Sequence, residues 1–392
     1  MSSETCPGEG RGPGHEAGLD GSSVGRVSGL DESGGEGVGD LDPGLRRGTG
    51  AAGLLKAEAT RRILVKDGAF GTAIQGYGLK EACYRGDYGL ERDQKGNNDL
   101  LCLTRPDIVR DIAQAYADAS ADVLGTNSFN ANRISQADYG AEHLVTPMNV
   151  AAARIVREVA DRASDADGKP RWVAGAIGPT NKTLSLSPRV EDPGYREVDW
   201  DTVAETYREQ AAALLEGGAD FILVETVFDT LNAKAAIWGV RKLGAHVPLM
   251  LSMTLTDLSG RNLSGHSVEA FWAAVRHADP VSVGLNCSFG ADQLRPHVAT
   301  LSGMADTLIM AYPNAGLPND LGAYDEPAEV TAAHIRDWAD GGTVNIVGGC
   351  CGTTPAHIAA IAEAVRGKAP RVPVAAPRQT LLAGLDPMRL AA

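Results

Sequence analysis

Eight short apolar runs recur along this chain, and this repeat restricts the possible folds more than any other feature of the sequence. The runs are followed by Gly, Asn, Thr or Pro and then by alanine-rich segments of helical period. They do not alternate apolar with polar residues, which is typical of parallel strands buried on both faces. Eight such units predict an α/β fold, a closed (β/α)8 TIM-type barrel, with an open doubly wound sheet as the competing architecture.

Predicted strands and helices alternate from about residue 57 onward. The strands are expected at 63–67, 122–127, 172–177, 221–225, 248–253, 281–286, 307–311 and 344–347. The helices are expected at 106–119, 148–163, 201–216, 231–243, 267–278, 292–301, 328–338 and 355–365. Pro106 and Pro355 mark two of the helix starts, because proline suits the first helical turn.

Composition divides the chain into three parts. Residues 1–54 hold 16 of the 47 glycines and no aromatic residue, so they cannot bury enough apolar surface to offset their ordering entropy. We therefore expect a disordered, Gly-rich N-terminal extension at 1–54, the barrel at 55–369, and a linker-like tail at 370–392.

Charge and hydropathy limit the classes of partner. Fifty acidic and 36 basic residues give a net charge of −14, which argues against binding to nucleic acid or to an anionic membrane surface. No apolar stretch approaches the roughly 20 residues that span a bilayer, and the N-terminus lacks the pattern of a signal peptide. We expect a cytoplasmic protein that binds small molecules or other proteins.

Three cysteines stand where predicted strands end. Cys287 follows the strand at 281–286, and Cys350 and Cys351 follow the strand at 344–347. Thiols so placed, in a chain without export signals, indicate a metal site more than a disulfide. Zinc suits three thiolates, and three protein ligands leave one position open, as in catalytic zinc sites. A coordinated thiol stays deprotonated and nucleophilic, which favours alkylation of a substrate thiol over hydrolysis.

Other interpretations of these cysteines remain open at this point. They could be ordinary buried thiols, Cys350 and Cys351 could form a strained vicinal disulfide, or Cys83 could complete a structural zinc site. The glycines at 348, 349 and 352 favour the metal, since they would let the backbone turn sharply and aim two neighbouring thiols at one ion.

Further polar residues end other predicted strands. Asp67 ends the first, Asn127 the second and Glu225 the fourth, and a closed barrel would direct all of them to the same mouth as the cysteines. Two carboxylates could bind an ammonium group, and the backbone N–H groups near Gly68 could bind a carboxylate. Asp67 and Glu225 could instead cap helices or pair with basic side chains. Together with the cysteines they predict a pocket for an amino acid that carries a thiol.

Seven sequence blocks resemble the homocysteine-binding module of cobalamin-dependent methionine synthase, in the homocysteine S-methyltransferase family. The resemblance extends from about Ile63 to Val365. The blocks are DGAFGT at 67–72, GNNDLL at 96–101, GPTN at 178–181, VETVFDTLNAK at 224–234, GLNC at 284–287, PNAGLP at 313–318 and GGCCGT at 348–353.

The resemblance implies a zinc-dependent enzyme that transfers a methyl group to homocysteine and forms methionine. It implies that Cys287, Cys350 and Cys351 bind zinc and form the catalytic centre, with the homocysteine thiolate as fourth ligand. Asp67 and Glu225 would bind the substrate's amino group and the backbone around Gly68 its carboxylate, and Asn127 is a further candidate for substrate contact. The methyl donor would be methylcobalamin, held by another module, and a folate-binding module would be a further partner.

The sequence departs from this family in two places. Gly125 stands where the family usually has a glutamate. The family continues past a segment like 382–387 into folate- and cobalamin-binding modules, whereas this sequence ends at Ala392. We expect those modules on separate polypeptides, as in a split methionine synthase, or a cut at the linker. Betaine or S-methylmethionine are alternative methyl donors, and a non-catalytic zinc- or homocysteine-binding protein is the alternative of another class.

Overall fold

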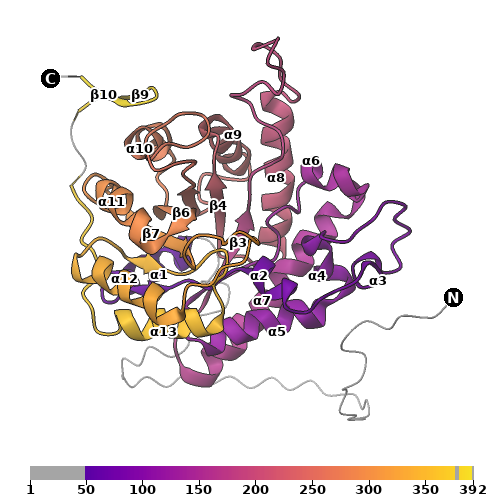
Figure 1. Cartoon of the computed structure of the whole chain (residues 1–392), viewed down its shortest axis with the longest axis horizontal. Coiled ribbons are helices and arrows are strands. Elements are labelled where there is room, and N and C mark those ends of the chain that lie inside the picture. The colour runs from indigo at the N-terminus through magenta and orange to yellow at the C-terminus, as the bar shows by residue number, and fades with distance from the viewer. Residues whose placement is uncertain (1–48, 376–378, 391–392) are drawn as a thin grey trace, which may run out of the picture.

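The computed structural model describes residues 49–375 and 379–390, and eight parallel strands form its centre (Figure 1). The strands are β1 (Leu64–Val65), β2 (Val123–Gly125), β3 (Trp172–Ile177), β4 (Phe221–Val227), β5 (Leu249–Met253), β6 (Ser282–Gly290), β7 (Leu308–Asn314) and β8 (Ile346–Val347). Each overlaps a strand predicted from the sequence.

The sheet runs in the order β1-β8-β7-β6-β5-β4-β3-β2, with every pair parallel. A single bridge between Lys66 and Val123 joins the two ends of this order, and the Asp67 amide donates to the Val123 carbonyl at 3.0 Å. The strands therefore close into a barrel, as predicted, and their C-terminal ends share one mouth.

Helices surround the strands (Figure 1). The eight that alternate with strands are α5 (Pro106–Asp118), α7 (Val145–Asp167), α8 (Trp200–Glu216), α9 (Thr230–Arg241), α10 (Val268–Val275), α11 (Ala291–Ser302), α12 (Ala328–Asp340) and α13 (Pro355–Val365). Shorter helices fill the long connections, namely α2 (Phe70–Gln75), α3 (Glu81–Arg85), η1 (Asn98–Leu100), α4 (Leu101–Thr104), α6 (Arg133–Gln136), η2 (Ala137–Tyr139), η3 (Glu142–Leu144) and η4 (Arg276–Ala278). None of the helices in the described part of the chain combines the length and apolar character needed to cross a bilayer.

Helix α1 (Thr49–Ala59) begins inside the segment 1–54 that composition predicts to be disordered. Its residues Ala51, Leu55 and Ala59 are buried and join the cluster that contains the strand residues Leu64 and Phe221. The spacing of four residues places them on one helical face. Residues 49–54 are therefore helical, contrary to that prediction, and the rest of it, residues 1–48, lies outside the described residues.

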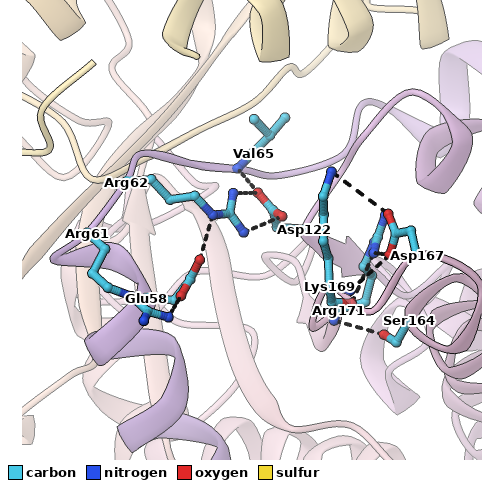
Figure 2. Close-up of polar contacts among 9 residues, drawn as sticks. All are labelled: Glu58, Arg61, Arg62, Val65, Asp122, Ser164, Asp167, Lys169 and Arg171. Atoms are coloured by element: carbon cyan, nitrogen blue, oxygen red, sulfur yellow. Dashed lines mark hydrogen bonds and ion pairs between the residues drawn. The ribbon is translucent and has the colours of Figure 1, made fainter. Parts of the chain in front are cut away.

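Ion pairs join α1 to the first strands of the barrel (Figure 2). The Arg62 guanidinium donates to both carboxylate oxygens of Asp122 at 2.8 Å and also to Glu58 at 2.7 Å. Asp122 Oδ2 in addition accepts from the Val65 amide at 2.8 Å. This pairing holds β1 beside the start of β2, where the barrel closes.

The described residues of the segment 370–392, predicted to be a linker-like tail, make defined contacts with the barrel. Arg371 is buried and donates to the carbonyls of Ser302, Ala305 and Thr307. Strands β9 (Leu381–Ala383) and β10 (Pro387–Arg389) pair as an antiparallel hairpin, and β9 packs against α10. These contacts are made with distant parts of the chain, so the local sequence does not indicate them.

Candidate metal centre and substrate pocket

The three predicted cysteine ligands meet at the mouth of the barrel. Cys287 lies on β6, and Cys350 and Cys351 lie in the loop between β8 and α13. Their sulfur atoms all lie within 4.8 Å of one another, and the Cys287 and Cys351 sulfurs are 3.8 Å apart. Each of the three residues is half-buried, so the cluster is reachable from solvent.

An irregular backbone presents Cys287. Cys287 and the next residue, Ser288, have φ values of 60° and 64°, in the left-handed region that non-glycine residues rarely adopt. The pairing of β6 with β7 shifts register between Asn286 and Gly290, which marks a bulge. Ser288 Oγ donates to the Leu255 carbonyl at 2.6 Å and accepts from the Leu255 amide at 2.8 Å. The left-handed backbone directs the Cys287 thiol toward the mouth, and these hydrogen bonds offset the conformational strain that this backbone carries.

Asn286, the residue before Cys287, makes hydrogen bonds that hold this part of β6 in place. It is buried, and its Oδ1 accepts from Ser252 Oγ at 2.7 Å and from the Thr226 amide at 3.0 Å. Its Nδ2 donates to Thr226 Oγ1 at 2.8 Å and points at the Cys350 sulfur at 3.9 Å. One amide group thereby links β4, β5 and β6 to the cysteine loop.

Glycines shape the loop that carries Cys350 and Cys351. Gly352 has a φ of 79°, and a Cβ atom there would lie 2.2 Å from the Tyr324 Cβ. Gly349 serves close approach, since a Cβ would meet the Thr353 side chain at 2.4 Å. The Cys350 amide donates to the Pro313 carbonyl at 2.7 Å, and Thr353 Oγ1 donates to the Cys350 carbonyl at 2.6 Å. The sharp turn predicted from the glycines is therefore present.

Crowding of the three sulfurs perturbs their ionisation. The proximity of the Cys287 and Cys351 sulfurs, with a smaller effect of partial burial, raises the pKa of Cys350 well above its usual value. Accepted hydrogen bonds from Cys287 and Cys350, with a further one from Tyr324, lower the pKa of Cys351 to about 3. Deprotonating all three thiols together requires a cation among them.

The donor set fits zinc. Two thiolates on one tetrahedral zinc lie about 3.8 Å apart, given Zn–S bonds of about 2.3 Å. Among the described residues no fourth Cys, His, Asp or Glu joins this group, so the set matches a site with an open position rather than a closed structural site. Cys350 and Cys351 are free thiols, which excludes a vicinal disulfide here, and Cys83 lies on α3 outside the group.

The two predicted amine-binding carboxylates are buried at the same mouth. Asp67 follows β1 and Glu225 lies on β4. Asp67 Oδ2 accepts from the Gly125 amide at 2.7 Å, and Glu225 Oε2 accepts from the Tyr312 hydroxyl at 2.8 Å. Burial raises the pKa of Glu225, and the charge of Lys66 partly opposes this rise.

Lys66 lies among these groups. Its ammonium group is buried, donates to Asp67 Oδ1 at 2.7 Å, and sits 4.8 Å from the centre of the Tyr312 ring. Burial lowers the pKa of Lys66, but the charges of Asp67 and Glu225 outweigh burial, and the pKa is raised overall. The ammonium group is thus held as a cation between two carboxylates.

Gly68 and Asn127, the two further residues predicted to contact the substrate, are both in contact with other parts of the protein. A Cβ at Gly68 would lie 2.8 Å from the Tyr116 ring and 2.9 Å from Thr353 Oγ1, so the backbone there is closely packed. The buried Asn127 donates through Nδ2 to the Asn98 carbonyl at 2.8 Å and so ties the long β1–β2 connection to the sheet. Their roles in substrate binding stay predictions.

Sequence reasoning missed four residues of this site, namely Lys66, Asn286, Tyr312 and Tyr324. Lys66 gave a signal, because it is a charged residue inside an otherwise apolar run. Asn286 directly precedes a predicted ligand. Tyr312 and Tyr324 gave none, since an aromatic residue in a strand or loop is most often a packing residue.

Comparison with known proteins agrees with the geometry. The family model for homocysteine S-methyltransferase matches residues 64–365. Among solved structures, the oxidised form of the homocysteine methyltransferase MmuM from Escherichia coli matches with a TM-score of 0.63 and 20% identity, covering 82% of this chain and 99% of that one. Its metallated form matches with a TM-score of 0.61 and 22% identity, covering 77% and 96%. The structural likeness supports the barrel fold, and the family model covers most of the chain. This protein therefore belongs to the homocysteine S-methyltransferase family.

Proposed function

We propose that this protein transfers a methyl group to the sulfur of homocysteine and forms methionine, at a zinc ion held by Cys287, Cys350 and Cys351. The observation that carries the proposal is the convergence of three sulfurs, one from β6 and two from the loop after β8, within 4.8 Å of one another. The family supports the reaction class. Bound zinc would keep the substrate thiol deprotonated at neutral pH while leaving it nucleophilic.

The chain's other residues would bind and orient the amino acid. The buried carboxylates of Asp67 and Glu225 would attract its ammonium group, and the backbone that follows Asp67 at Gly68 would receive its carboxylate. Asn286 would hold Thr226 and the cysteine loop in register, so that the thiol and the amine are bound at a set separation. Orientation of this kind supplies much of the rate enhancement in a displacement reaction.

The methyl donor in this proposal is methylcobalamin carried by a separate polypeptide that also works with a folate-binding module. The sequence blocks at 224–234 and 313–318, which resemble the cobalamin-dependent type, support this choice. The substrate sulfur would form a bond to the methyl carbon as the cobalt–carbon bond breaks, and the electron pair would stay on cobalt as cob(I)alamin. The proposal places the protein in the cytoplasm, where thiols remain reduced.

Parallel assays with each donor test the proposal. Zinc-loaded protein given homocysteine and free methylcobalamin should form methionine and cob(I)alamin in equal amounts, measured by mass spectrometry and by the cobalamin absorbance. Betaine and S-methylmethionine serve as the other arms, and turnover with one of them alone would replace the donor but keep the homocysteine chemistry. Formation of no product with any donor would favour the non-catalytic binding protein.

A further inference from the structure

The ammonium group of Lys66 sits beside the two carboxylates that the proposed function assigns to the substrate's amino group. It donates to Asp67 at 2.7 Å, and Glu225 is close enough that its charge acts on Lys66. Only 5% of the Lys66 residue surface is exposed. A buried ammonium needs such partners, because an unpaired charge in the interior is very costly.

Gly125 provides the space that this ammonium group uses. A Cβ atom at residue 125 would lie 3.5 Å from both Asp67 oxygens and 3.6 Å from Lys66 Nζ. Any longer side chain at Gly125 would therefore extend into the Lys66–Asp67 pair. The Gly125 amide already donates to Asp67 Oδ2 at 2.7 Å, so both oxygens of this carboxylate have a donor from the protein itself.

Tyr312 completes the enclosure and connects the two carboxylates. Its ring faces the Lys66 ammonium at 4.8 Å, a distance at which a cation is attracted to an aromatic ring. Its hydroxyl donates to Glu225 Oε2 at 2.8 Å. Asp67, Lys66, Tyr312 and Glu225 thus form one continuous chain of contacts across the mouth.

Counting charges shows what the lysine changes. Asp67 and Glu225 contribute two negative charges, and Lys66 cancels one of them before any substrate binds. A substrate ammonium then neutralises one remaining charge, whereas without Lys66 it would meet two. The substrate's ammonium group therefore contributes less to the binding free energy when Lys66 is present than when it is absent.

We propose that Lys66 is a specificity-determining residue, a resident ammonium group that shares the Asp67–Glu225 site and weakens the requirement for an amino group on the thiol substrate. This inference rests on the proposed function and names the substrate class more narrowly. The class is short thiols with a carboxylate, with or without an α-amino group. Lys66 acts through the carboxylates and touches none of the reacting atoms.

Calorimetric titration of zinc-loaded protein tests the inference without turnover. The two ligands are L-homocysteine and des-amino homocysteine, which keeps the thiol and carboxylate but lacks the amine. The Kd of the des-amino ligand divided by that of homocysteine should rise at least about tenfold in Lys66→Met, because a tenfold change in Kd corresponds to about 1.4 kcal/mol, no more than one hydrogen bond between charged groups contributes. Lys66→Arg retains the charge and should keep the wild-type ratio. Lys56→Met, an exposed change on α1, is the matched control.

The outcomes separate this inference from the proposed function. An unchanged ratio in Lys66→Met, with both thiols still bound, overturns the role of Lys66 alone. Binding of neither thiol to the wild-type protein overturns the inference and the proposed function together. Should Lys66→Met fail to fold, the wild-type ratio decides: a value below about tenfold supports the inference, and a larger value overturns it.

Discussion

The sulfur atoms of Cys287 and Cys351 lie 3.8 Å apart although 64 positions separate these residues in the chain. The bulged part of β6 and the loop after β8 bring them together, and the separation equals the approximate 3.8 Å expected for two thiolates on one tetrahedral zinc. The pair is therefore already arranged for an ion.

Loss of one sulfur should abolish zinc binding. We expect Cys350→Ala to lose stoichiometric zinc and activity together, because two thiolates do not retain the ion against a chelator. Metal analysis of the purified protein measures this. Cys102→Ala, at a buried cysteine outside the cluster, is the control and should keep its zinc. One zinc per chain in Cys350→Ala would contradict the ligand assignment.

Replacing Gly352 should distort the cysteine loop. In Gly352→Ala the new Cβ would lie 2.2 Å from the Tyr324 Cβ, so the loop must shift and zinc affinity should fall by about tenfold or more. Competition with a coloured chelator measures the affinity. Gly367→Ala is a matched control, because Gly367 also has a positive φ, 72°, but has open space around it. Equal zinc affinity in the two variants would show that the close approach at Gly352 is unimportant.

Asn286 should position Cys287 without binding the metal. Asn286→Ala removes the acceptor of Ser252 and of the Thr226 amide, so we expect zinc affinity to fall about 10- to 100-fold. The free energy of unfolding should fall by about 1–3 kcal/mol, as for other buried groups that lose a partner. Zinc titration and urea unfolding give the two quantities. Asn130→Ala, in an exposed turn, should change neither.

Asp99 should make stability depend on pH. Burial raises its pKa to about 7 from an unfolded value of 3.8, so the folded state binds more protons between these values. The contribution of Asp99 to the free energy of unfolding is therefore fully present below about pH 4 and is lost as pH rises toward 7. Asp99→Asn should be more stable than wild type at pH 8, by up to about 4 kcal/mol, and should lose this advantage near pH 4. Urea unfolding at several pH values tests this, with exposed Asp118→Asn as control; a constant difference would contradict it.

The Arg62–Asp122 pair should stabilise the closure of the barrel (Figure 2). In Arg62→Met, the Val65 amide is the only hydrogen-bond donor among the described residues that remains for the buried Asp122 carboxylate. Because Arg62 is about one-third exposed, the expected loss is about 1–3 kcal/mol, below that of a fully buried pair. Arg61→Met, at the exposed neighbour, should cost under about 0.5 kcal/mol. Thermal unfolding compares them, and equal losses would contradict a special role for Arg62.

The sequence predicted the barrel and the cysteine cluster because both depend on local patterns. Each strand shows as an apolar run, and each helix shows its period and, in α5 and α13, its starting proline. Parallel strands of a closed barrel place their C-terminal ends at one mouth, so residues at those ends can be grouped without coordinates. Cys287, Cys350 and Cys351 were found in this way.

The sequence by itself determined the order of strands and helices, because each element shows in the local spacing of apolar residues. It also determined which residues follow each predicted strand, because the end of an apolar run marks that position. Only the tertiary structure decided that α1 packs on the barrel, that residues 381–389 form a hairpin, and that Cys287 takes a left-handed backbone. It also decided that Lys66 lies between Asp67 and Tyr312 beside Gly125. These features depend on contacts between residues far apart in the chain, where burial and charge pairing act only after the barrel has closed.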